Sequence, residues 1–120
     1  MATVKLLRGE PITVHMVAPS DVVPGQVVLR NNIPFIAINR AASGQVAAFA
    51  AGGGVYGIVT GPVHGTLIPG LQALFSTTGK FSQIDSPSDG QCMHLGFWVN
   101  VSAGYGEFVH NPSGQLPVEV

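Results

Sequence analysis

The chain has 120 residues and a formal net charge of −1, and only 9% of its residues are charged, against about 25% in an average soluble domain. Its five Lys and Arg residues are scattered, so the clustered cations that neutralise nucleic-acid phosphates are missing. A single cysteine excludes an intrachain disulfide, and no stretch approaches the ~18 consecutive apolar residues of a membrane span, so neither nucleic acid nor membrane is expected as a partner.

The small number of charged residues also predicts the composition of the surface. Small polar and apolar groups must cover it, and such a surface favours association with other protein chains. The length fits one domain that buries roughly two-thirds of the surface exposed by its unfolded chain. Residues 1–11 lack the apolar core of a secretory signal peptide, so we expect an unprocessed protein made in a reducing cytoplasm.

Residues 1–19 are expected to form an extended N-terminal arm. Gly9 and Pro11 interrupt its apolar residues. Residues 12–17 alternate between apolar and polar positions, with Ile12, Val14 and Met16 on one side. This alternation predicts either an edge strand or a strand donated to a partner.

Residues 20–112 are expected to form one β-rich domain. Their short β-branched or aromatic runs are bounded by Gly, Pro, Asn or Ser, as is typical of strands joined by tight turns. The runs are 27–30, 35–40, 45–50, 55–60, two short pieces within 67–76, then 94–101 and 105–110. The glycines at 52–54 argue against a helix in the alanine-rich stretch before them. The sequence therefore predicts a compact antiparallel all-β domain with little helix, followed by an extended tail at 113–120.

Two segments of this domain are alike. Pro24 to Gln45 and Pro69 to Gln91 both begin with Pro-Gly, run through a strand, a polar turn and a second strand, and end with Gly-Gln. The pattern predicts a hairpin in each segment. A structural duplication and a chance likeness of Gly-rich β sequences both explain it.

The clearest alternation lies within 94–101. One face of this predicted strand is apolar and carries Leu95, Phe97, Val99 and Val101. Trp98 is on the other face, where a large aromatic side chain is typical of a subunit interface. Trp98, together with Tyr105 after the next turn, is therefore predicted to contact a second subunit, and most other aromatic residues are expected in the core.

No catalytic or cofactor site is predicted. Gly52, Gly54 and Gly57 match the spacing of a dinucleotide-binding loop, but a β run follows them where that site requires a helix. The sequence has no Gly-x-Ser-x-Gly elbow and no phosphate-binding loop. We expect a protein that is not an enzyme and that binds no cofactor.

No metal site is predicted either. The histidines are His15, His64, His94 and His110, and none of them has the short spacing of a metal-binding pair, although antiparallel strands would bring the last two near each other. Asp85 and Asp89 lack the spacing and closing Glu of a calcium loop, and they lie among ordinary turn formers.

Several short pieces follow one another in a recognisable order between Ile12 and Pro112. They are Pro24-Gly25-Gln26-Val27-Val28, Pro34-Phe35-Ile36-Ala37, Ala42-Ser43-Gly44-Gln45-Val46-Ala47, Gly54-Val55-Tyr56, Ile68-Pro69-Gly70-Leu71-Gln72-Ala73-Leu74-Phe75, Gly79-Lys80-Phe81, Leu95-Gly96 and Ala103-Gly104. Their order and spacing resemble those of the small capsid-decoration proteins of tailed phages, the glycine-rich relatives of the lambda-type head-stabilising protein.

The resemblance implies a β-barrel or β-tulip-like domain that sits on the outer capsid surface of a virion as a homotrimer. Such a protein is made in the host cytoplasm and cements neighbouring major capsid protein subunits against internal DNA pressure. In that family an N-terminal arm often adds a strand to the sheet of the capsid. The residues placed to do so here are Val4, Leu6, Leu7, Arg8, Ile12, Val14 and Met16.

An alternative reading is a head-fibre, tail or surface-adhesion module built on the same β scaffold. It would be present in few copies, or would bind a cell-surface glycan through exposed aromatic residues such as Trp98 and Tyr105.

Overall fold

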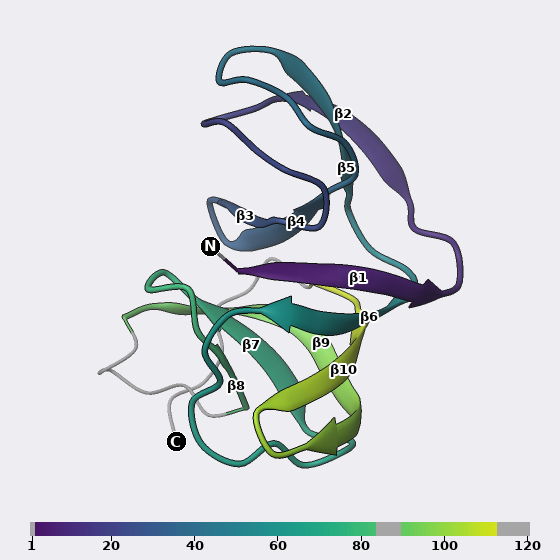
Figure 1. The fold of residues 1–120 in the computed structure, drawn as a ribbon, viewed down its shortest axis with the longest axis vertical. Helices are drawn as coiled ribbons and strands as arrows, with labels where there is room; N and C mark the ends of the chain where they lie inside the picture. The colour runs from purple at the N-terminus through teal and green to yellow at the C-terminus, as the bar shows by residue number, and fades with distance from the viewer. Residues whose placement is uncertain (1, 84–89, 113–120) are drawn as a thin grey trace.

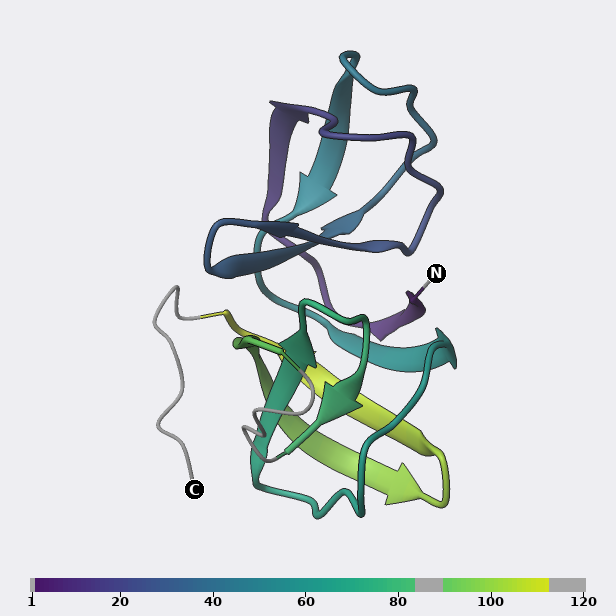
Figure 2. The same ribbon diagram turned by 90° about the vertical axis from the view of Figure 1, so that its left-hand side faces the viewer.

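The structure is a computed structural model that describes residues 2–83 and 90–112. All regular elements in these residues are β-strands, which form two antiparallel sheets, so the all-β prediction is confirmed. Figures 1 and 2 show two lobes stacked along the long axis, one for each sheet. The described residues contain no helix that could span a membrane. The tail at 113–120, Asp85 and Asp89 lie outside the described residues.

The larger sheet has six strands in the order β1-β6-β10-β9-β7-β8. Their bounds are β1 Thr3–Arg8, β6 Val55–Thr60, β10 Tyr105–His110, β9 Cys92–Ser102, β7 Gln72–Ser76 and β8 Phe81–Ser82. Beyond β8, Phe81 N–H donates to Pro62 O (2.9 Å) and His64 N–H donates to Phe81 O (2.8 Å). The sheet therefore curls back toward the segment after β6, but its strands do not close into the predicted barrel.

The smaller sheet has four strands in the order β2-β5-β4-β3. They are β2 Thr13–Val17, β5 Val46–Ala50, β4 Ile33–Ala37 and β3 Val27–Arg30. The Arg30 guanidinium donates to Val17 O (3.0 Å), which ties the two outer strands together at one end. Pairing of β3 with β4 and of β7 with β8 confirms both predicted hairpins.

The main core is built mostly by the larger sheet and is rich in aromatic rings. Trp98 has no exposed surface and meets Phe81 and Phe108 edge-on, with ring centroids 6.5 and 5.6 Å apart. Its indole N–H donates to Ser82 O (3.1 Å), so its single polar group is satisfied inside the core. Val27 and Ile36 of the smaller sheet belong to the same core, which joins the lobes into one unit. A second, smaller cluster around Phe49 lies within the smaller sheet.

The predicted alternation along β9 is wrong because the strand contains two β-bulges. Ala73 pairs with Gly96 while Leu74 pairs with His94, which leaves Leu95 as an extra residue. Glu107 pairs with Asn100 while Phe108 pairs with Trp98, which leaves Val99 as the second. Each bulge shifts the alternation of side chains by one residue. As a result Trp98 is buried and Phe97, expected in the core, is 41% exposed.

The segment predicted as a separate arm is part of both sheets. β1 pairs with β6, and its Val4 side chain is buried in the main core. β2 pairs with β5 as an edge strand, one of the two alternatives predicted for residues 12–17. Residues 1–19 therefore do not project from the domain, because their backbone and apolar side chains are used within it.

β1 also bonds to the smaller sheet, and Figure 1 shows it at the boundary between the lobes. Val4 N–H donates to Gly25 O (2.8 Å) and Val27 N–H donates to Ala2 O (3.1 Å). Gly25 N–H donates to Ala37 O (2.8 Å), which continues the link to β4. Gly25 has a φ of +84°, and a Cβ there would collide with the Val4 carbonyl oxygen. Only glycine fits this junction.

We predict that Gly25→Ala destabilises the protein by about 3 kcal/mol or more, since it combines a left-handed φ with a steric clash. Gly44→Ala is the matched control, because Gly44 has a φ of +86° and a Cβ there meets nothing within 4 Å. The control should cost only about 1–2 kcal/mol. Urea unfolding monitored by tryptophan fluorescence measures both, and equal losses would contradict the role of the Val4–Gly25 junction.

Candidate functional site

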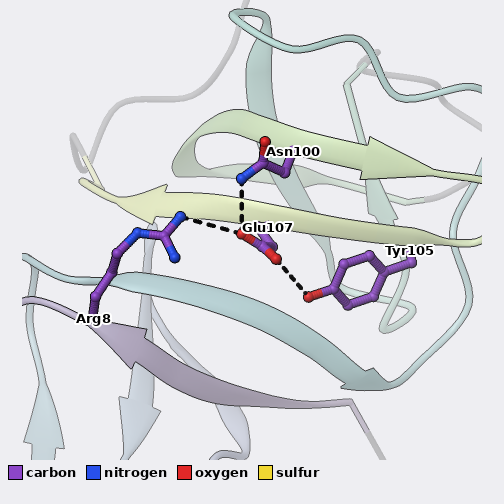
Figure 3. Close-up of polar contacts among 4 residues, drawn as sticks. All are labelled: Arg8, Asn100, Tyr105 and Glu107. Atoms are coloured by element: carbon purple, nitrogen blue, oxygen red, sulfur yellow. Dashed lines mark hydrogen bonds and ion pairs between the residues drawn. The ribbon is translucent and has the colours of Figure 1, made fainter.

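A group of polar side chains lies on the larger sheet around Glu107 of β10 (Figure 3). Its Oε1 accepts hydrogen bonds from Asn100 Nδ2 (3.0 Å) and Arg8 Nη2 (3.3 Å), and its Oε2 accepts one from the Tyr105 hydroxyl (3.0 Å). The donors come from β9, β1 and β10. Gly57 of β6 pairs with Glu107, and a Cβ at Gly57 would collide with the Tyr105 hydroxyl. The glycine therefore leaves the space in which these side chains meet.

The surroundings of Glu107 favour its ionised form. Hydrogen bonds from Asn100 and Tyr105, and then the charge of Arg8, lower the pKa of the carboxyl group. Burial, followed by the bond to Glu107, raises the pKa of the Tyr105 hydroxyl. Neither group is thus poised to exchange a proton near neutral pH. The arrangement links β1, β9 and β10 and gives Arg8 and Tyr105 structural partners within the chain.

His110 is a second polar group, located where the two lobes meet. It has no exposed surface, and its Nε2 lies 2.9 Å from Pro34 O. Because a carbonyl oxygen only accepts, Nε2 carries the proton. Among the described residues, Nδ1 has no hydrogen-bond partner. Burial lowers the pKa of His110, and the bond to Pro34 partly offsets this effect. His110 is a neutral imidazole that joins β10 to β4.

The part of the chain that the structure describes brings no metal-binding group together. Among residues 2–83 and 90–112, no cluster of three or more His, Cys, Asp or Glu side chains has a suitable arrangement. His110 instead packs edge-on against Tyr56 and Phe108, with ring centroids 5.7 and 6.4 Å away.

The predicted capsid-contact residues fall into three classes. Val4 is buried, so its assignment to a contact surface is wrong: its side chain belongs to the main core. Val14 and Met16 are half-buried and pack against the smaller cluster. The members that remain exposed are Leu6, Leu7, Arg8 and Ile12.

The predicted subunit-interface residues are also placed differently. Trp98 has no surface left for a second subunit, because the bulges in β9 turn its ring into the core of its own chain. Tyr105 is half-buried, with its hydroxyl engaged by Glu107. Phe97 is the aromatic residue that β9 exposes instead.

An apolar groove of about 540 Å³ lies at the junction of the lobes. It is lined by Val4, Lys5, Leu6, Pro11, Thr13, Pro24, Gly25, Ile36, Ala37, Ile38 and Tyr56. These residues come from β1, β2, β4, β6 and three connecting segments, so no local pattern in the sequence predicts the groove. Leu6 and Ile38, each 41% exposed, are its large exposed apolar side chains.

Comparison of the chain with models of protein families, with curated proteins and with solved structures finds no match in any of the three.

We predict that acidification below about pH 6.5 lowers the free energy of unfolding through His110. An unfolded histidine protonates near pH 6.5, whereas the folded pKa of His110 is lower. The unfolded state therefore binds more protons in this range, and the stability present above pH 6.5 is lost as the pH falls toward the folded value.

His110→Gln should make the free energy of unfolding depend less steeply on pH, by up to about 1.4 kcal/mol per pH unit. His15→Gln, at an exposed position of β2, should leave it unchanged. Urea unfolding at a series of pH values gives the comparison. A His110→Gln profile parallel to that of the parent between pH 5 and 7 would show that His110 does not titrate on unfolding.

Glu107 is expected to make the free energy of unfolding depend on pH in a separate, more acidic pH range. Its folded pKa lies below the ordinary 4.5, so its contribution is present above that value and is lost as the pH falls through the folded pKa. Glu107→Gln should lower the Tm at pH 7 by a few degrees and weaken the loss of stability below about pH 4.5. Glu10→Gln, an exposed carboxylate, serves as the control. Equal effects of the two substitutions would argue against the linking role of Glu107.

Proposed function

We propose that this chain is a structural virion protein that binds the outer surface of an assembled phage capsid as trimers. It would be made in the host cytoplasm and would cement neighbouring major capsid protein subunits against internal DNA pressure. The observation that carries the proposal is a surface poor in charge and rich in large apolar side chains. Only 9% of the chain is charged, and ten large hydrophobic residues are exposed in the described part. Where such side chains lie together, they mark protein-protein contacts.

Several exposed apolar residues lie close together in sequence on β1 and the segment that follows it. Leu6, Leu7 and Ile12 are 41%, 39% and 67% exposed. Their contacts with one capsid subunit would be weak individually, but trimeric binding multiplies them through effective concentration. A protein that binds the assembled lattice and not free subunits stabilises that lattice by mass action.

The adhesion-module reading loses its main support in this fold. It relied on an exposed Trp98 as part of an aromatic binding surface, and Trp98 is buried.

We expect the protein to be present in purified virions at close to one copy per major capsid protein. Quantitative mass spectrometry of intact particles measures this ratio. A handful of copies would identify a fibre or tail part, and absence from the particle would overturn the proposal.

We also expect Ile12→Lys to weaken binding to expanded shells by at least about tenfold, since a charge in an apolar contact must be desolvated. Val46→Lys is the matched control, because Val46 is 66% exposed and lies on β5, away from β1. Co-sedimentation with shells stripped of the protein gives both affinities, and shells refilled with the parent protein should withstand higher temperature than stripped ones. Equal binding by the two variants would remove the segment after β1 from the contact.

A further inference from the structure

The apolar groove between the lobes is bordered by parts of two strand edges with which no other strand of the described residues pairs. Its lining includes the buried residues Val4, Ile36 and Tyr56, which belong to the main core. Leu6 and Ile38 border it with partly exposed apolar side chains. Because the deeper residues are held by core packing, the groove is preformed.

The first open edge belongs to β1. One edge of this strand pairs with β6, and the other bonds to the smaller sheet only at its start, where Val4 N–H donates to Gly25 O. The ladder ends there, because Gly25 N–H turns to Ala37 O and not to Val4 O. Backbone groups alternate between the two edges of a strand, so those of Leu6 point to the same side as those of Val4, away from β6. Within the described residues, no strand pairs with Leu6 on that side.

The second open edge belongs to β2, next to Thr13. Ile12 N–H donates to Gly52 O (2.7 Å) and Ile12 O accepts from Ala51 N–H (2.8 Å), so the backbone of Ile12 faces the chain that follows β5. By the same alternation, the backbone of Thr13 faces away from β5. β2 has no second neighbour in the sheet formed by the described residues. Thr13 and Leu6 both line the groove.

The chemistry of the lining selects the kind of ligand. Lys5 is the one charged residue among those that line the groove, and the others are apolar apart from Thr13 and Gly25. An N–H and C=O pair with which no strand of the described residues pairs, next to an apolar groove, matches an extended polypeptide, which supplies a ladder of hydrogen bonds and alternate side chains together. Pro11 and Pro24 flank the open edges and limit an added strand to a few residues.

We propose that this groove binds a short, extended segment of another protein, which adds as a strand to β1 at Leu6. The segment carries apolar side chains at alternate positions, packed beside Leu6 and Ile38, and an acidic residue near Lys5. This inference goes beyond the proposed function and does not depend on it, because any partner that presents such a segment would bind.

The test is an NMR titration of the isotope-labelled full chain with two capped hexapeptides. The first is Thr-Val-Glu-Val-Thr-Val, and the second is the same peptide with N-methylated valines, which keep the apolar surface but cannot donate to a strand edge. We expect the first peptide to shift the amide signals of Lys5, Leu6, Thr13 and Ile38 and to slow hydrogen exchange at Leu6. The N-methylated peptide should bind at least about tenfold more weakly.

Substitutions at two groove residues test the proposed peptide binding further. Lys5→Glu, at an exposed position, should reverse the charge preference, so that Thr-Val-Lys-Val-Thr-Val binds better than the glutamate peptide. Ile38→Glu should abolish binding of the glutamate peptide, while Val46→Glu, on an exposed face of β5, should not. Equal binding of the unmodified and N-methylated peptides, or no shift at millimolar peptide, would overturn the proposal. Either result would leave the copy number in virions as a separate test of capsid decoration.

Discussion

The arrangement of the two lobes depends on one strand that bonds to both sheets. β1 pairs with β6 along one edge, while Val4 N–H and Ala2 O bond to the smaller sheet along the other. The Val4 side chain enters the shared core at the same point. Gly25 makes this possible, because a side chain there would occupy the position of the Val4 carbonyl oxygen. This glycine thus lets β1 bond to the smaller sheet, and its own N–H bond to Ala37 O ends the ladder between them.

Buried polar groups then fix the orientation of the elements around that junction. His110 donates to Pro34 O between the lobes, and the Trp98 indole donates to Ser82 O within the larger one. Apolar packing alone is not directional, whereas a buried hydrogen bond is costly to leave unmade and so favours one geometry. Tyr56 packs against His110 and also lines the groove. The shape of the groove is therefore tied to the packing of the core.

The few charges of the chain are used in a way that leaves much of the surface apolar. Arg8 and Glu107 bind each other and link strands of the larger sheet. The exposed hydrophobic residues are distributed over both lobes, and those of β1 lie beside this ion pair and beside the groove. Burial of such residues on association is favourable. The proposed binding to a capsid and the proposed binding of a peptide segment both rely on this property, and Leu6 belongs to both surfaces.

The sequence by itself determined the β class, both hairpins and the turns between them, because alternation, β-branched runs and glycine punctuation act over a few residues. Only the tertiary structure decided that bulges at Leu95 and Val99 exchange the expected places of Phe97 and Trp98. The same holds for the burial of Val4 and for the groove. These features depend on which distant strands pair and in which register, and a local pattern carries no information about that choice.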